Sequence, residues 1–195
     1  IPYNAPETLY YHCSAHSGMG ASITGITTNE KLADQYASNC VLALPLVGAN
    51  SDVCASIACT SSTKSVTSNA DAAASRDKSN FYAGSFEFDG TGDYLNLDIG
   101  SGGLGSGDFT IEFWSNSDTT SGSRGQFQLS PTSGGLKAGA GTALAVYQET
   151  GQSSYRMYVN DNASGNSTSA TDSNKWNHFA VVRSSSTQKL YINGI

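Results

Sequence analysis

The sequence has 195 residues, of which 13% are charged, and its formal net charge is −6. An ordinary globular domain carries about 25% charged residues, and the few lysines and arginines stand singly along this chain. This pattern argues against nucleic acid as a partner, because phosphate binding needs clustered basic residues. Membrane insertion is not expected either, because no apolar run in the sequence approaches the ~18 residues of a membrane span.

The first 25 residues are predicted to form a short N-terminal unit. They contain a thiol, an imidazole and a thioether in Cys-x2-His-x2-Met spacing, at Cys13, His16 and Met19. Electron-transfer copper sites combine ligands of these types. Residues 26–38 are predicted to be a linker that holds a short helix. The second domain is predicted to cover residues 39–195.

Strand signals dominate from residue 41 onward. Residues 41–48 are a short apolar run, which Pro45 restricts to an edge strand or a bulged strand. Residues 85–99 indicate a strand, a glycine turn and a second strand. Gly90 and Gly92 provide the turn because glycine adopts positive φ at little cost.

The strand pattern continues to the end of the sequence. In residues 108–114, Phe109, Ile111 and Phe113 alternate with polar or amphipathic neighbours. Further strands are predicted at residues 125–130, 142–148, 154–160, 176–183 and 189–194. Glycine-rich and serine-rich turns are predicted at residues 101–107 and 162–174, and residues 69–80 are interpreted as a helical turn or a polar loop. Many short strands with little helix predict an all-β antiparallel jelly-roll sandwich.

The four cysteines leave two interpretations open. Cys54 and Cys59 are close enough in sequence for a disulfide that closes a small loop. In the other interpretation, Cys40 and Cys59 are small, buried apolar side chains.

Four motifs in the second domain resemble one protein superfamily. They are FEFDGTGDYL at residues 86–95, DFTIEFW at 108–114, KWNHFAVVR at 175–183 and KLYING at 189–194. Their order and spacing are similar to those of the concanavalin A-like lectin/glucanase superfamily, in its laminin G-like branch. Members of that branch continue for several strands beyond the last motif. We therefore expect this domain to be truncated at its C-terminus, and both ends of the chain to be incomplete.

The N-terminal unit resembles the last strand and copper loop of cupredoxins. In that family a second histidine comes from a strand far upstream, which this chain lacks, so the resemblance implies a cupredoxin-like C-terminal remnant. Copper at Cys13, His16 and Met19 is expected only in a complete parent domain. The combination of this loop with a laminin G-like domain resembles fibre or appendage proteins in the virions of marine tailed bacteriophages.

Glycan hydrolysis is not expected. Laminarinase-type relatives of this fold place catalytic carboxylates in an E-x-D-x-x-E pattern on one strand. Here Glu87 and Asp89 are followed by the glycines of the predicted turn, and no second glutamate follows. We therefore expect a non-enzymatic protein.

Carbohydrate binding, with Ca²⁺ as a cofactor, is the leading hypothesis. Sugar sites use aromatic rings for stacking and amide or carboxylate oxygens for hydroxyls or calcium. The candidates are Asp89, Asp93, Asn96, Asp161, Asn162 and Asp172, with Tyr155, Tyr147 or Tyr158 as the ring. The alternative for each aspartate and asparagine is a local backbone hydrogen bond in a turn.

In the strand predicted at residues 176–183, His178 lies on the same face as Trp176 and Ala180. We interpret it as a structural histidine that is hydrogen-bonded inside the sandwich, with a ligand contact as the alternative.

The resemblance implies a virion appendage protein that attaches to carbohydrate on a host surface. Its expected partners are host glycans, other virion subunits and further copies of itself. It would assemble in the host cytoplasm and be exposed extracellularly on the virion. The alternative is a purely architectural protein that decorates a capsid or tail and binds no sugar.

Overall fold

The computed structural model describes residues 8–12, 20–23, 36–53, 61–100, 103–118, 123–130, 143–152, 154–166 and 171–195. Within these ranges the chain consists of antiparallel strands and the 3-10 turn η1 (Ala37–Asn39). None of the helical structure in these ranges is long and apolar enough to span a membrane. The chain divides into two compact units, residues 1–98 and 99–195.

The first unit contains three antiparallel strand pairs among its described residues. β1 pairs with β2, β3 pairs with β6 and β4 pairs with β5. The bounds of these strands are β1 Leu9–His12, β2 Gly20–Ile23, β3 Val66–Asn69, β4 Ala73–Ser75, β5 Ser85–Glu87 and β6 Tyr94–Leu97. The β3–β6 and β4–β5 pairs join the same two stretches of the chain, so the turn between β3 and β4 lies opposite the loop between β5 and β6.

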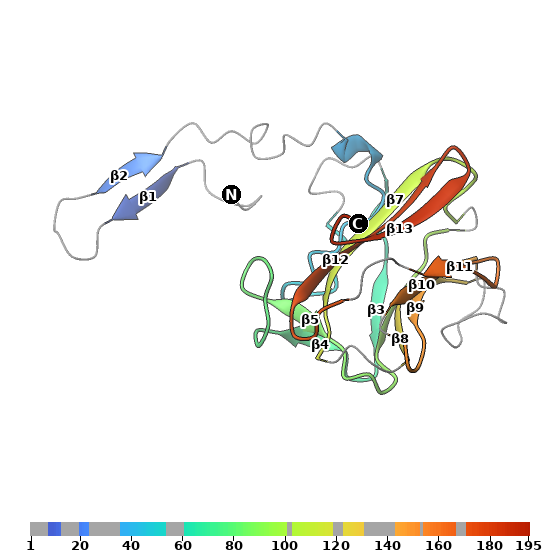
Figure 1. Cartoon of the computed structure of the whole chain (residues 1–195). Helices are drawn as coiled ribbons and strands as arrows, with labels where there is room; N and C mark the ends of the chain where they lie inside the picture. Colours follow the sequence, from blue (N-terminus) through green and yellow to red (C-terminus); the bar gives the residue numbers. More distant parts are fainter. Residues whose placement is uncertain are drawn as a thin grey trace. The chain divides into compact units, whose positions relative to one another are not determined.

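The second unit contains two sheets. One has the strand order β11-β10-β9-β8 and the other has the order β13-β12-β7 (Figure 1). The bounds are β7 Phe109–Asn116, β8 Arg124–Leu129, β9 Leu144–Gln148, β10 Tyr155–Val159, β11 Asn162–Asn166, β12 Trp176–Ser184 and β13 Thr187–Ile192. β12 is the central strand of its sheet and pairs with β7 over eight residues.

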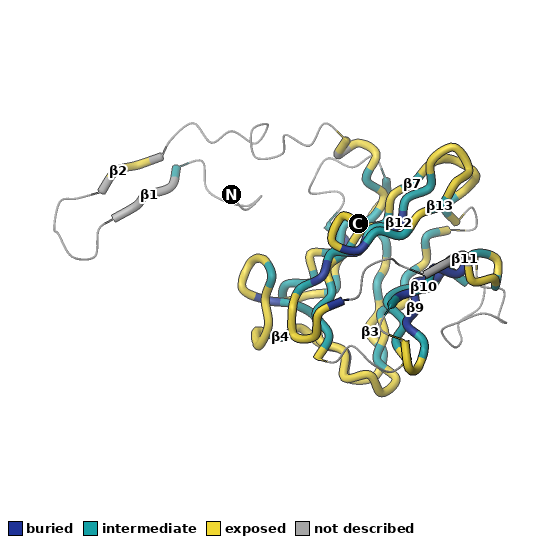
Figure 2. Tube along the Cα trace, in the orientation of Figure 1, coloured by how far each residue is buried: buried dark blue, intermediate teal, exposed yellow. Residues whose placement is uncertain are grey.

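The core of the second unit lies between these two sheets. Leu144, Val146 and Met157 from β9 and β10 cluster with Phe179, Val181 and Ile192 from β12 and β13. The Phe179 ring stacks on Phe113 with 5.1 Å between centroids and meets Tyr155 edge-on at 5.0 Å. Figure 2 shows the buried stretches along β9, β10 and β12. Burial of aliphatic and aromatic surface of this kind is the main stabilising contribution to a sandwich.

Arg183, near the end of β12, fixes the glycine-rich turn before β7. Its Nε donates to the carbonyl oxygen of Gly107 at 2.6 Å, and its Nη2 donates to that of Gly105 at 2.8 Å. The guanidinium also lies over the Phe109 ring, 4.6 Å from the centroid. The turn at residues 103–107 is therefore held by a single side chain from another part of the sequence.

The structure confirms the all-β antiparallel sandwich and the strands predicted in residues 108–114, 125–130, 142–148, 154–160, 176–183 and 189–194. It also confirms positive φ at Gly90 and Gly92, with values of 86° and 85°. The alternation in β7 is confirmed as well, because Phe109, Ile111 and Phe113 pack against the core.

Three local predictions were wrong. Residues 41–48, all of them described, form no strand: Leu46 has a φ of 54°, and the buried Asp52 accepts a hydrogen bond from the Ala43 amide at 3.1 Å instead. The segment predicted as a turn at 162–174 begins with β11. Residues 73–75 form β4, where a helical turn or a polar loop was predicted.

Several predictions concern residues outside the described ranges. They are the linker helix up to residue 35, the Cys54–Cys59 disulfide, the burial of Cys59 and the Cys13, His16, Met19 loop. Cys40 is half-buried, and its Sγ donates to the carbonyl oxygen of Leu42 at 3.4 Å. The boundaries at residues 25 and 38 stay predictions.

Candidate functional site

Three aspartates from two loops of the first unit come together in the structure. Asp71 lies in the turn between β3 and β4, and Asp89 and Asp93 lie in the loop between β5 and β6. The strand pairing explains this arrangement, since Asn69 is opposite Tyr94 and Ala73 is opposite Glu87. The turn that holds Asp71 must therefore face the loop that holds the other two aspartates.

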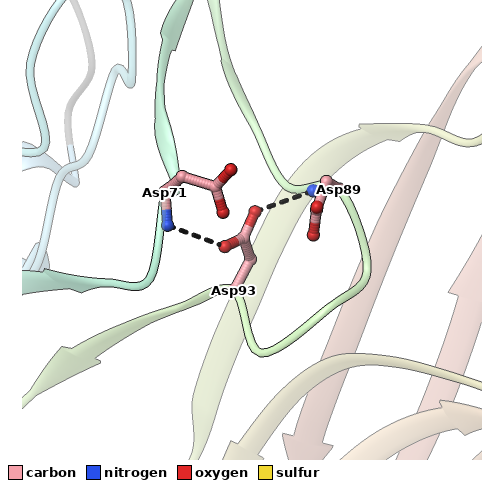
Figure 3. A group of neighbouring side chains, drawn as sticks. All are labelled: Asp71, Asp89 and Asp93. Atoms are coloured by element: carbon pink, nitrogen blue, oxygen red, sulfur yellow. Dashed lines mark hydrogen bonds between the residues drawn. The ribbon is translucent and has the colours of Figure 1, made fainter.

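Asp93 is the centre of the group and links the two loops. Its Oδ1 accepts a hydrogen bond from the Asp71 amide at 3.2 Å, and its Oδ2 accepts one from the Asp89 amide at 2.7 Å (Figure 3). Asp89 in turn accepts a hydrogen bond from the Thr91 amide at 2.6 Å. Gly90 and Gly92 let the loop fold back on itself, because both adopt positive φ.

One carboxylate oxygen of each aspartate lies within 4.8 Å of an oxygen of the other two. Calcium binds oxygen ligands at 2.3–2.6 Å, so two oxygens on opposite sides of one ion are about 5 Å apart. The spacing of the three carboxylates therefore suits a single Ca²⁺. Asp71 and Asp89 are exposed, which leaves room for water or hydroxyl oxygens to complete the coordination.

The pKa values of the pair Asp71 and Asp93 move in opposite directions. A backbone hydrogen bond from Asp89 is the main cause that holds the pKa of Asp93 below its ordinary value. The backbone amide of Asp71 lowers the pKa of its own carboxyl, but the hydrogen bond with Asp93 and the charges of Asp93 and Asp89 together raise it above its ordinary value. Of these two carboxyls, Asp71 therefore keeps its proton to the higher pH.

The other predicted oxygen ligands lie elsewhere. Asn96 is exposed on β6, and its carbonyl oxygen accepts a hydrogen bond from Thr67 Oγ1 at 3.5 Å. Asp161, with a φ of 63°, and Asn162 belong to the β10–β11 hairpin of the second unit, where Asn162 Nδ2 donates to the carbonyl oxygen of Asn160 at 2.7 Å. Asp172 pairs with Lys175 at 2.9 Å. Of these residues, Asn162 shows the local backbone hydrogen bond that was the alternative for turn residues.

The prediction of Tyr155 as a stacking ring was wrong. Its ring is 1% exposed in the core, where its hydroxyl accepts a hydrogen bond from Gln126 Nε2 at 3.0 Å. Burial raises the pKa of Tyr155. Tyr147 and Tyr158 are also buried, and they meet edge-on with 6.5 Å between centroids. The alternating pattern of β10 gave no sign that both of its faces are covered, since Tyr155 and Tyr158 point to opposite faces.

His178 also differs from the favoured interpretation. It lies next to the buried Phe179, so its side chain leaves β12 on the face away from the core. There its ring centroid is 5.0 Å from that of Trp114, and its Nε2 is 3.3 Å from Glu112 Oε2. It is thus not hydrogen-bonded inside the sandwich.

Sequence reasoning missed Asp71. Its neighbours in residues 69–80 show no strand periodicity, and the β3–β6 pairing that brings it to Asp93 joins strands about 25 residues apart. The described strands β1 and β2 flank the Cys13, His16, Met19 loop as an antiparallel pair, with His12 opposite Gly20. That this chain by itself holds no copper stays a prediction.

Comparison with known proteins identifies the family. Residues 89–195 match the protein family described as the concanavalin A-like lectin/glucanases superfamily. Comparisons with the curated proteins and with the solved structures gave no match. The match covers more than half of the chain and includes both sheets of the second unit as well as Asp89 and Asp93. The chain, with its antiparallel sandwich, therefore belongs to the concanavalin A-like lectin/glucanases superfamily.

Proposed function

We propose that this chain is a non-enzymatic carbohydrate-binding protein that uses Ca²⁺ to hold its sugar ligand. The grouping of Asp71, Asp89 and Asp93 is the observation that carries the proposal. Calcium at these oxygens would offset the repulsion among three carboxylates. Its remaining coordination positions face solvent, where vicinal sugar hydroxyls have suitable oxygen donors. Membership in a superfamily of lectins and glucanases supports sugar as the ligand class.

The hydrogen bonds that Asp93 accepts from two backbone amides support a binding role over hydrolysis. A raised and a lowered pKa on neighbouring carboxyls also occur in glycosidases, where the two groups flank the scissile bond about 5 Å apart or more. Here both oxygens of Asp93 accept hydrogen bonds from the backbone amides of Asp71 and Asp89, so this carboxylate joins two loops of the chain.

The biological setting is also a proposal. The resemblance of the sequence motifs to those of tailed-phage appendage proteins, together with the low charge of the chain, supports a virion protein that is assembled in the host cytoplasm and binds glycans on the host surface. In that setting the chain would contact other virion subunits and further copies of itself.

A glycan array, run with calcium and again with a chelator, tests the proposed function. We expect specific glycans to be retained in calcium and their signal to fall in chelator or in Asp93→Asn. Asp77→Asn is the matched control, because Asp77 is an exposed aspartate of the same unit outside the group of three. If a folded protein retains no glycan in either condition, carbohydrate binding is wrong.

The architectural alternative is favoured by a different observation. Several large apolar side chains of the first unit are about half exposed or more, among them Phe81, Tyr82, Phe88 and Tyr94. Exposed aromatic side chains are common anchors in protein interfaces. Loss of particle assembly in Phe81→Ser/Tyr82→Ser, with glycan binding unchanged, would favour the architectural role.

A further inference from the structure

We propose a second sugar-binding site, independent of calcium, on the outer face of the β7–β12–β13 sheet, with Trp114 as its stacking ring. The proposal rests on the proposed function in taking carbohydrate as the ligand class. It concerns residues of the second unit, whereas the three aspartates belong to the first unit.

The strand register defines this outer face. Phe113 and Phe179 point into the core, so their neighbours Trp114 and His178 point outward and lie directly opposite each other. In the next row Glu112 is opposite Ala180, which is itself opposite Tyr191 on β13. Opposite side chains in such pairs have Cβ atoms about 5 Å apart. Five side chains thus form two adjacent rows on one rigid surface.

Trp114 is held in position and still offers part of its ring to solvent. It is 44% exposed, although tryptophan is on average a highly buried residue. His178 supports it from β12, with 5.0 Å between the ring centroids and 45° between the planes. The backbone of His178 is itself fixed by Asn193, whose Oδ1 accepts from the His178 amide at 2.9 Å and whose amide donates to the His178 carbonyl oxygen at 2.8 Å.

Polar groups beside the indole match sugar hydroxyls. The Glu112 side chain is 65% exposed and 3.3 Å from His178 Nε2, so one oxygen is oriented while the carboxylate stays open to solvent. Ala180 is half-buried, and its short side chain lies between the longer side chains of Glu112 and the half-buried Tyr191. An apolar ring face next to a few oriented acceptors and donors is the general pattern of a small-ligand site.

The size of this surface favours a sugar over a protein partner. A stable protein interface buries about 800 Å² on each side around several apolar anchors. Here the exposed indole of Trp114 shares its face with one further indole, the half-buried Trp176, and with the exposed polar side chains of Thr110, Glu112 and Lys189. One indole face is about as large as one pyranose ring, so the arrangement suits one or two sugar units.

Intrinsic fluorescence tests the proposal directly. The sequence has two tryptophans, so the full chain carrying Trp176→Phe keeps Trp114 as its one indole. The probes are neutral gluco-, manno- and galacto-oligosaccharide hexamers and their uronic-acid counterparts, titrated in chelator. We expect at least one probe to change the Trp114 emission saturably. Trp114→Ala in the otherwise native chain should weaken that probe about tenfold, as expected for loss of one aromatic contact.

The controls separate this site from the calcium site. Tyr82→Ala removes an aromatic side chain that is 67% exposed in the first unit, and Asp93→Asn removes the central carboxylate there. Both variants should keep the chelator-resistant binding. If Trp114→Ala fails to fold, the emission titration still decides the matter.

Two results would overturn the proposal, and they differ in what else they overturn. Sugar that binds only in calcium, or binds in chelator while Trp114 emission stays constant, removes the second site and leaves the proposed function intact. No binding by any probe or array glycan, with or without calcium, removes both.

Discussion

At the scale of single residues, the carboxyls of Asp71 and Asp93 affect each other's pKa. The pKa of Asp71 is raised, so its carboxyl destabilises the folded state at neutral pH, and this cost disappears as the pH falls through the raised pKa. The pKa of Asp93 is lowered, so its contribution to stability is present above the ordinary aspartate pKa and is lost as the pH falls through the lowered value.

Calcium affinity should therefore fall earlier on acidification than it would for ordinary aspartates, because the proton on Asp71 competes with the ion. Titration calorimetry at decreasing pH measures this. Asp71→Asn should weaken calcium binding at neutral pH and slightly raise the melting temperature without calcium, since one of three repelling charges is removed. Equal calcium affinity in Asp71→Asn and in Asp77→Asn would contradict the assignment.

Arg183 is a second residue whose role depends on its particular side chain. Lysine has one donor nitrogen in place of a planar fork, so Arg183→Lys cannot bond Gly105 and Gly107 together or stack on Phe109 in the same way. We expect a loss of about 1–2 kcal/mol in the free energy of unfolding, measured by urea denaturation.

Amide hydrogen exchange over residues 103–107 should also become faster in Arg183→Lys. The exposed Arg76 provides the matched control, and Arg76→Lys should change neither property. Unchanged exchange in the Arg183 variant would mean that the turn does not depend on the guanidinium.

At the scale of elements, the β4–β5 hairpin combines strain with exposure. Phe81 and Gly84 form a bridge around Tyr82 and Ala83, which have φ values of 60° and 58°. Two consecutive positive φ values are typical of a type I′ turn, which prefers asparagine and glycine. Ser79 supports the turn, because its Oγ accepts from the Gly84 amide at 3.0 Å and donates to the Phe81 carbonyl oxygen at 2.9 Å.

Replacing Ala83 by glycine should stabilise the protein. Left-handed backbone costs a non-glycine residue about 1–2 kcal/mol, whereas the extra freedom of glycine in the unfolded chain costs about 0.4–1 kcal/mol. We therefore expect Ala83→Gly to raise the free energy of unfolding by about 0.5–1 kcal/mol, measured in urea. Ala73→Gly in β4 is the control, and there the free energy should fall. A decrease in both variants would mean that the turn is not strained at Ala83.

Elements that pack against a core were the ones predictable from sequence. β7, β12 and β13 alternate between core and outer residues, and this period of two is visible in the residue types. β4 and β11 consist of small or polar residues, so their pairing depends on partners that sequence reasoning does not see. The same limit explains the site: Asp89 and Asp93 follow from a visible glycine turn, but Asp71 joins them only through the β3–β6 pairing.

At the scale of the whole molecule, the two proposed binding sites lie in different units of the chain. The described part of the first unit has short strand pairs of three or four residues, whereas the second has a shared core between two sheets. Short pairs with little buried apolar surface open locally at low free energy. The first unit therefore has the greater need of a stabilising ligand at its aspartates.

Calcium should accordingly protect one unit and not the other. At a concentration 100 times its dissociation constant, a ligand that binds only the folded state stabilises it by about 2.7 kcal/mol. All three aspartates lie in the first unit, so amide exchange should slow over residues 66–97 and stay constant over residues 144–192. Magnesium is the control, because it requires shorter oxygen distances of about 2.1 Å and releases its water reluctantly. If calcium slows exchange equally in both ranges, its effect is not local to the aspartates, because a local ion can protect only the amides whose opening would break its coordination.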